Sequence, residues 1–215
     1  SPQPSAPSPM RVGPHELSVV GIVAISRTAA CTRYAKDADR APQMGARVDL
    51  LRMSAWEVGS FDRVVALAAE HGIDAAGAAE RFTDVLGDFD ERLRPLDWAE
   101  RLVKTYIAFG LLIDFGMALS DSLAEPLRGG LIDELSLDPI GSYAIAELET
   151  VIAADPQLAA RLGLWGRRVV GEEIGSFQRL LAQFPELLGT IAPERLHTVL
   201  SQGAVSRMKG LGLRV

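Results

Sequence analysis

Apolar side chains recur at helical spacing through most of the chain and divide it into long amphipathic segments. Residues 16–39 show the pattern of a mostly buried helix, which Pro42 stops. Residues 49–72 carry two adjacent apolar stripes, and Gly72 is the expected glycine just beyond the helix end. Because no segment alternates between apolar and polar residues with period two, the pattern predicts an all-α fold.

Aspartates mark where the middle helices begin. Asp74 is expected to cap a shorter helix that runs to about residue 90. Asp97, followed three residues later by Glu100, resembles a capping box and predicts a long helix over residues 98–124. Apolar residues almost surround this helix, which indicates a central position in a bundle.

Prolines divide the C-terminal third of the chain. A helical run over residues 127–154 is interrupted at Asp138-Pro139, which predicts either a kink or a stop followed by a restart with Asp138 as N-cap. Asp155-Pro156 opens the next helix, to about residue 184, and a last helix covers residues 193–209. The count is six or seven helices, four of them long, so we predict a four-helix bundle with accessory helices.

The length of 215 residues fits one substantial domain with its own core. Residues 1–9 read SPQPSAPSP, a proline and serine tract that cannot bury a core. We therefore expect a disordered tail over residues 1–13 and a single domain over residues 14–215.

Composition and charge narrow the function classes. With 48% apolar but only 6% aromatic residues, the chain favours helices over sheets. The net charge of -6 disfavours a broad nucleic-acid surface and leaves room only for a local basic patch near the C-terminus, formed by Arg195, Arg207, Lys209 and Arg214.

Compartment and membrane signals are also limited. The single cysteine, Cys31, excludes an intrachain disulfide and fits a reducing compartment, so we expect the cytoplasm. The longest apolar stretch, residues 106–119, is broken by Asp114 and falls short of the roughly 20 residues that a membrane span needs. We therefore expect no membrane partner.

Motifs for common chemistries are scarce. Glu194-x-x-His197 has the spacing of a metal-binding helix pair, but no second such pair exists, and we interpret it as structural or solvated. There is no glycine-rich phosphate loop, nucleophile elbow or cysteine pair, so hydrolase, nucleotide-binding and dithiol chemistry lack support. Several aromatic residues could line a ligand cavity, although aromatics on helix faces more often form core: Trp56, Phe61, Tyr106, Phe109, Phe115 and Tyr143.

One carboxylate, Glu57, stands on an inward apolar stripe of the segment 49–72. A charged carboxylate left alone in a core costs several kcal/mol or more, so it must pair with a cation or bind a metal. Arg27 lies on the inward stripe of the preceding helix, and we predict that it pairs with Glu57, directly or through Ser60 or a water. The alternative is that Arg27 extends to the surface while Glu57 takes up a proton or bonds to a tyrosine such as Tyr106.

Short segments spread over nearly the whole chain from Val19 onward share the order and spacing of a known family: Phe61-Asp62-Arg63, Glu70-His71-Gly72-Ile73-Asp74, Pro95-Leu96-Asp97-Trp98, Leu102-Val103-Lys104, Ile152-Ala153-Ala154-Asp155-Pro156, the stretch 165–172, Arg207-Met208 and Leu211-Gly212-Leu213. Together they resemble the ferritin-like proteins related to the tRNA-(2-methylthio-N6-isopentenyl-adenosine) hydroxylases, in the actinobacterial branch. The resemblance implies a ferritin-like bundle with two irons held by carboxylates and histidines, and an oxygen-dependent hydroxylase ancestry.

When the family's iron ligands are carried over position by position, most of the expected acids and histidines are absent from this sequence. Asp114 and Glu172 survive, without an assigned ligand role. The resemblance implies a vestigial site in which the ligand positions are occupied by Arg27, Glu57, Ser60, Phe109, Leu137 and Ile140. A di-iron centre needs two or more oxygen and imidazole ligands per iron, so we expect neither a metal nor another cofactor.

The preferred hypothesis is therefore a degenerate ferritin-like protein, a pseudoenzyme that acts as a binding or protein-interaction module. We expect a homodimer, a protein partner of unknown identity and no specific nucleic-acid ligand. Two alternatives stay open: an active di-iron tRNA hydroxylase-like oxygenase whose ligands lie elsewhere, and a binder of an apolar small molecule in the vacated centre of the bundle. Inward histidines would favour the oxygenase.

Overall fold

The computed structural model describes residues 11–86 and 92–215, which are helical and contain no strand. The all-α prediction is confirmed. Of the expected tail, residues 1–10 lie outside the described part, and residues 11–13 lead into the first helix. The elements are α1 (Pro14–Asp39), α2 (Met44–Ala69), α3 (Ala75–Glu80), α4 (Thr83–Leu86), α5 (Trp98–Ser120), α6 (Leu127–Leu135), α7 (Pro139–Ala154), α8 (Pro156–Gln183), the 3-10 helix η1 (Pro185–Leu187) and α9 (Pro193–Gly210).

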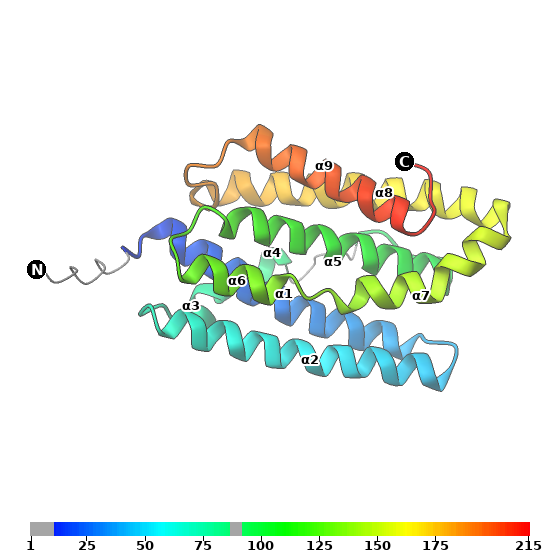
Figure 1. The fold of residues 1–215 in the computed structure, drawn as a ribbon, viewed down its shortest axis with the longest axis horizontal. Coiled ribbons are helices and arrows are strands. Elements are labelled where there is room, and N and C mark those ends of the chain that lie inside the picture. The colour runs from blue at the N-terminus through cyan, green and yellow to red at the C-terminus, as the bar shows by residue number, and fades with distance from the viewer. Residues whose placement is uncertain (1–10, 87–91) are drawn as a thin grey trace, which may run out of the picture.

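Long helices pack side by side in a bundle (Figure 1). Helices α1 and α2 form an antiparallel pair and pack along most of their length. Helix α5 contacts α1, and α6 and α7 follow one another along α5. An antiparallel pair, α8 and α9, covers another side of α5, so α5 lies at the centre of the molecule.

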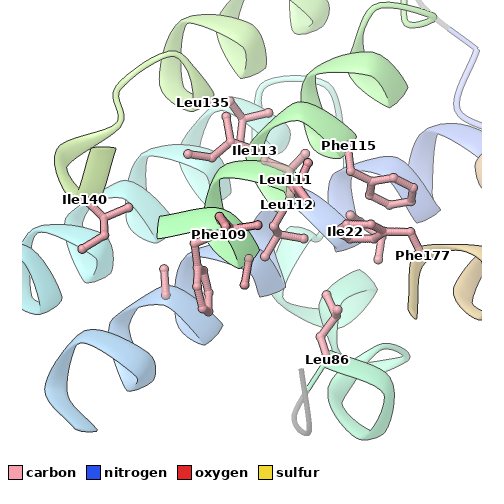
Figure 2. Packing of buried hydrophobic residues seen from close by; sticks show 14 of the residues in the cluster. Ile22, Leu86, Phe109, Leu111, Leu112, Ile113, Phe115, Leu135, Ile140 and Phe177 are labelled. Atoms are coloured by element: carbon pink, nitrogen blue, oxygen red, sulfur yellow. The ribbon is translucent and has the colours of Figure 1, made fainter. Parts of the chain in front are cut away.

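Most residues of α5 are buried, as its nearly continuous apolar surface predicts. By length and composition α5 could cross a membrane, but 83% of its most apolar window is buried within the protein, which is the pattern of a core helix. Phe109 and Phe115 leave it in different directions (Figure 2). Phe109 packs on Tyr34 of α1 with ring centroids 5.9 Å apart, and Phe115 stacks on Phe177 of α8 at 4.6 Å.

Aspartate caps begin four of the helices, as predicted. Asp74, Asp97, Asp138 and Asp155 each accept a hydrogen bond from a backbone N–H in the first turn that follows. The bond from Gly141 N to Asp138 Oδ1 is 3.0 Å long, and it settles the question left open at Pro139. Helix α6 ends at Leu135, and a separate helix, α7, begins at Pro139. The two are not continuous because proline has no backbone N–H to donate to α6.

Some boundaries differ from the prediction. Helix α2 begins at Met44, five residues earlier than expected, directly after the extended residue Gln43. Gly72 follows its end with φ of +72°, the left-handed conformation that glycine adopts without strain. The helix expected from residue 75 to about 90 is two short helices, α3 and α4, and its last part lies outside the described residues. Helix α5 ends at Ser120 rather than near residue 124.

Candidate functional site

Helices α1 and α2 bring a cation, a carboxylate and a hydroxyl into the interior of the bundle. Arg27 lies near the middle of α1, and Glu57 and Ser60 lie one turn apart on the facing side of α2. Their exposed fractions are 2%, 1% and 0%, respectively. The sequence marked Arg27 and Glu57 because they interrupt inward apolar stripes, and the resemblance marked Ser60 at the histidine position of the Glu-x-x-His unit. The structure brings all three inside.

The predicted pair between Arg27 and Glu57 is present. Arg27 Nη1 lies 3.4 Å from Glu57 Oε2. Arg27 Nε donates to Ser26 Oγ at 3.2 Å, so the guanidinium is held from its own helix as well. Two parts of the alternative are wrong, because Arg27 does not reach the surface and the Tyr106 hydroxyl donates to Arg207 O rather than to Glu57. Its third part, a proton on Glu57, is compatible with the pair.

The pair is incompletely satisfied. Among the described residues, Arg27 Nη1, Glu57 Oε2 and Ser60 Oγ have no hydrogen-bond partner, although all three atoms are buried. A buried polar atom without a partner costs about 1 to 3 kcal/mol, and more if it is charged. The contact is thus a single ion pair rather than the two parallel hydrogen bonds that an arginine and a carboxylate can form.

Burial raises the pKa of Glu57 to about 7, against the opposing effect of Arg27. Glu134 and Asp138 raise this pKa further through their negative charge, and Arg63 lowers it. Near neutral pH the carboxyl therefore exchanges between its charged and neutral forms. The Arg27 guanidinium lowers the pKa of Glu57 by less than burial raises it.

A second acid, Glu134 of α6, belongs to the same polar region. Arg63 of α2 binds it through both oxygens, with Nη2 2.8 Å from Oε1 and Nε 3.1 Å from Oε2. Burial is the largest single effect on the pKa of Glu134 and would raise it. The hydrogen bonds and the charge of Arg63, together with smaller effects that include the charge of Arg27, lower this pKa on balance. Sequence reasoning missed Glu134, although it precedes Leu137 by one helical turn.

The other residues of the expected vestigial site divide into two groups. Phe109 and Ile140 are buried with exposed fractions of 3% and 0%, and both belong to the apolar core (Figure 2). Leu137 lies in the break between α6 and α7 and is 51% exposed, so its side chain is not part of the buried cluster.

These residues do not fit a di-iron centre. Glu57 faces a guanidinium, both oxygens of Glu134 are bound by Arg63, and Arg27 places a positive charge where a cation would bind. The three histidines lie elsewhere: His15 bonds to Ser122 and to the backbone of Glu186, His71 follows the end of α2, and His197 is exposed on α9. Within residues 11–86 and 92–215, no group of three histidine, cysteine or acidic side chains could hold a metal ion.

A separate polar cluster is built around Arg207 of α9. Its Nη2 lies 3.1 Å from Asp114 Oδ1 on α5, and its Nη1 lies 3.0 Å from Asp138 Oδ2, the N-cap of α7. Tyr106 adds a hydrogen bond to the Arg207 carbonyl at 2.9 Å. Arg207 was expected in a C-terminal basic patch, and this prediction is wrong: its side chain is only 15% exposed because two carboxylates bind it inside.

Comparisons with known proteins place this geometry in context. A family model described as a ferritin-like domain of actinomycetes matches residues 15–193. One solved structure, a protein from Synechococcus described as having aldehyde deformylating oxidase activity, is similar with a TM-score of 0.66 and 18% identity over 94% of this chain and 92% of that chain. At that identity the likeness shows the fold alone. No curated protein matches the sequence.

Proposed function

Because the chain belongs to the actinomycete ferritin-like domain family, we propose that it is a ferritin-like bundle without a di-iron centre that acts as a binding or protein-interaction module. The segments quoted above support a position near the tRNA-(2-methylthio-N6-isopentenyl-adenosine) hydroxylases within this group. On this proposal the chain is a pseudoenzyme, in which the fold is kept for its surfaces rather than for oxygen chemistry.

The observation that carries the proposal is the Arg27–Glu57 pair. The 3.4 Å contact places a fixed positive charge between α1 and α2, against the carboxylate that a metal ion would need. Arginine keeps its charge under all ordinary conditions, so it does not yield this place to a cation by deprotonation. With Ser60 one turn from Glu57, the imidazole of a Glu-x-x-His unit is also replaced by a hydroxyl.

Metal content after exposure to iron tests this proposal directly. The purified protein is incubated with excess ferrous iron without oxygen, desalted and analysed for iron, manganese and zinc. We expect far less than one metal ion per chain. The double variant Arg27→Glu/Ser60→His, which removes the guanidinium and supplies an imidazole, should retain more iron than the wild type under the same conditions.

Two iron atoms per wild-type chain would contradict the proposal and favour the di-iron hydroxylase-like oxygenase. If the bound iron disappeared in a Glu57→Gln variant, the ligands would lie at the cluster described above. If it stayed, they would lie elsewhere.

The third hypothesis, an apolar ligand in the vacated centre, receives less support. Phe109 packs on Tyr34 and Ile140 is fully buried, so apolar side chains occupy positions that the ligand would need. We therefore keep the interaction module as the proposed function.

A surface of α2 supports the proposed homodimer. Met44, Leu51 and Val58 are 69%, 45% and 52% exposed, and they are spaced seven residues apart, with Val65 half-buried in the next position. Apolar residues that repeat every seven positions form one stripe along a helix, which is the pattern that packs against a second helix. A second copy presents the same stripe, so a two-fold axis beside α2 would bury both.

Sedimentation equilibrium tests the dimer. The variant Leu51→Glu/Val58→Glu should be a monomer, while Leu164→Glu, at a 62% exposed position on α8, should leave the assembly unchanged. A wild-type monomer at high concentration, or a dimer that tolerates both changes on α2, would contradict this interface.

We also propose cytoplasmic localisation, based on the single Cys31, and no specific nucleic-acid ligand. Any tRNA binding should be weak and should fall steeply with salt, because the net charge is -6 and Arg207 is withdrawn into the interior. Filter binding at increasing salt measures this. Tight binding that persists at high salt would contradict it.

A further inference from the structure

The end of α1 and the start of α5 lie at the same end of the bundle (Figure 1). A basic cavity of about 570 Å³ is lined by residues from these two segments and from the linker before α5. Its lining contains six cationic side chains and one carboxylate: Arg33, Lys36, Asp39, Arg40, Arg94, Arg101 and Lys104, together with Leu93 and Pro95. On a chain with net charge -6, this concentration of positive charge is unexpected.

Two acids at the end of α1, Asp37 and Asp39, already form ion pairs. Asp39 pairs with Arg47 outside the cavity, at 3.0 Å. Asp37, fully buried beneath the cavity, accepts a hydrogen bond from Thr105 and lies 3.4 Å from Arg101 Nη1 and 3.8 Å from Arg33 Nη1. One carboxylate is thus shared between two arginines.

The positive charge that is available to a ligand comes from Arg40 and Arg94. Arg33, Lys36 and Lys104 each have further interactions, and Lys104 donates to the carbonyl of Leu93, so they are not counted as available. In the described part of the chain no acid forms an ion pair with Arg40 or Arg94, and both are exposed. Two guanidinium groups from different segments therefore line the same cavity without a carboxylate partner there.

Stabilisation of a helix end accounts for only part of this charge. The C-terminal end of α1 favours cations, which explains Lys36 and Arg40 near Asp39. Arg94 and Arg101 belong to the linker and to α5, and the dipole of α1 gives no reason for them to line the same cavity.

We propose that this cavity binds a small molecule that carries two or more phosphate groups. Guanidinium groups bind phosphate oxygens through paired hydrogen bonds, and several of them around one cavity match an anion with several charges. The volume suits a ligand of the size of pyrophosphate or a nucleotide, and Leu93 and Pro95 offer a short apolar wall for an organic moiety. This site is independent of the bundle centre and goes beyond the interaction module proposed above.

The charge of the rest of the chain selects a small ligand over a nucleic acid. A long polyanion would lie across surfaces of a protein with net charge -6 and would gain only the few contacts inside the cavity. A compact phosphate compound places all of its charge against the arginines and avoids that repulsion.

Calorimetric titration with pyrophosphate and with ATP, each free of divalent metal, tests the proposal. We expect saturable binding at low salt that weakens as salt is raised. The variant Arg40→Ala/Arg94→Ala should lose affinity by at least about tenfold, since each arginine contributes a charge-assisted hydrogen bond. The control Arg52→Ala/Arg195→Ala removes the same charge from exposed positions outside the cavity and should bind as the wild type does.

Three results would overturn the proposal. The first is no heat of binding from either compound at low salt. The second is an equal loss of affinity in both double variants, which would indicate a general charge effect. The third is that tRNA binds while neither pyrophosphate nor ATP binds or displaces it, which would indicate a nucleic-acid surface. Circular dichroism melting of both variants confirms that they are folded.

Discussion

Two inward-facing arginines lie at different places in this bundle and contact different numbers of carboxylates. Arg207 reaches two carboxylates at 3.0 and 3.1 Å, whereas Arg27 reaches a single carboxylate at 3.4 Å. Asp114 and Asp138 together raise the pKa of Arg207, although burial alone would lower it. Burial raises the pKa of an acid in both clusters: that of Asp114 beside Arg207, and that of Glu57 beside Arg27 to about 7.

The surroundings explain the difference. Two glycines leave room for the Arg207 cluster. A Cβ on Gly110 would collide with Arg207 Nε, and a Cβ on Gly203 would collide with Asp114 Oδ2. Among the described residues no glycine makes comparable space around Arg27. Each cluster keeps one buried carboxylate oxygen without a hydrogen bond, Glu57 Oε2 in one and Asp114 Oδ2 in the other. The Arg207 cluster thus joins α9 to α5 and α7, while Arg27 supplies a charge that the isolated carboxylate needs.

Removal of Arg207 should have the largest effect. Arg207→Met leaves Asp114 and Asp138 without a cation, and the loss should be about 3 to 5 kcal/mol in the free energy of unfolding. Urea denaturation of this variant measures it. Arg52→Met, at a position where the side chain is 78% exposed, is the matched control and should change stability by less than about 0.5 kcal/mol. Equal effects in the two variants would mean that the Arg207 cluster does not stabilise the fold.

The pH dependence of stability distinguishes the Glu57 carboxyl. Its pKa is raised on folding from 4.5 to about 7, so the folded state binds the proton more tightly than the unfolded chain. The contribution of Glu57 should therefore be fully present below about pH 4.5 and should be lost as pH rises towards 7, by about 3 kcal/mol at most.

The difference between wild type and Glu57→Gln, measured by urea denaturation from pH 5 to 8, isolates this contribution from other titrating groups such as Asp37 and Asp114. Near pH 5 the two proteins should be close in stability, and towards pH 8 the wild type should become less stable than Glu57→Gln. A difference that is flat across this range, or a wild type that gains stability relative to the variant as pH rises, would contradict the raised pKa of Glu57.

The glycine beneath Arg207 gives a smaller but specific effect. Gly110→Ala places a methyl group against three atoms of the Arg207 side chain and should destabilise the protein by about 1 to 3 kcal/mol. Gly171→Ala, in the middle of α8 with no atom within 4 Å of the added Cβ, should stabilise it by up to about 1 kcal/mol. If both variants were more stable than the wild type, the Arg207 side chain would have moved without a loss of stability. Its position would then not depend on Gly110.

Much of the fold could be predicted because its signals are local. The caps at Asp74, Asp97, Asp138 and Asp155 act within one turn, and the apolar stripes are readable along each helix. The Arg27–Glu57 pair could also be predicted, because two charges on inward stripes of consecutive helices have few partners other than each other.

The features that were missed depend on packing between distant segments. Arg207 resembles a surface residue in the sequence, and only the space above Gly110, almost one hundred residues earlier, lets it turn inward. Glu134 lies in α6, and nothing local shows that Arg63 of α2 reaches it. The basic cavity joins the end of α1 to the start of α5, so its charges are dispersed along the sequence and form no run.

A double-mutant cycle on Arg27→Met and Glu57→Leu tests most directly whether the arginine holds the place of a cation. At pH 8, where Glu57 is charged, each single variant leaves one buried partner alone and should lose about 3 kcal/mol. The double variant replaces both by apolar side chains of similar size and should recover most of that loss, with a coupling energy of about 2 kcal/mol or more. Additive losses, with no recovery in the double variant, would mean that the two side chains do not depend on each other and would contradict the account.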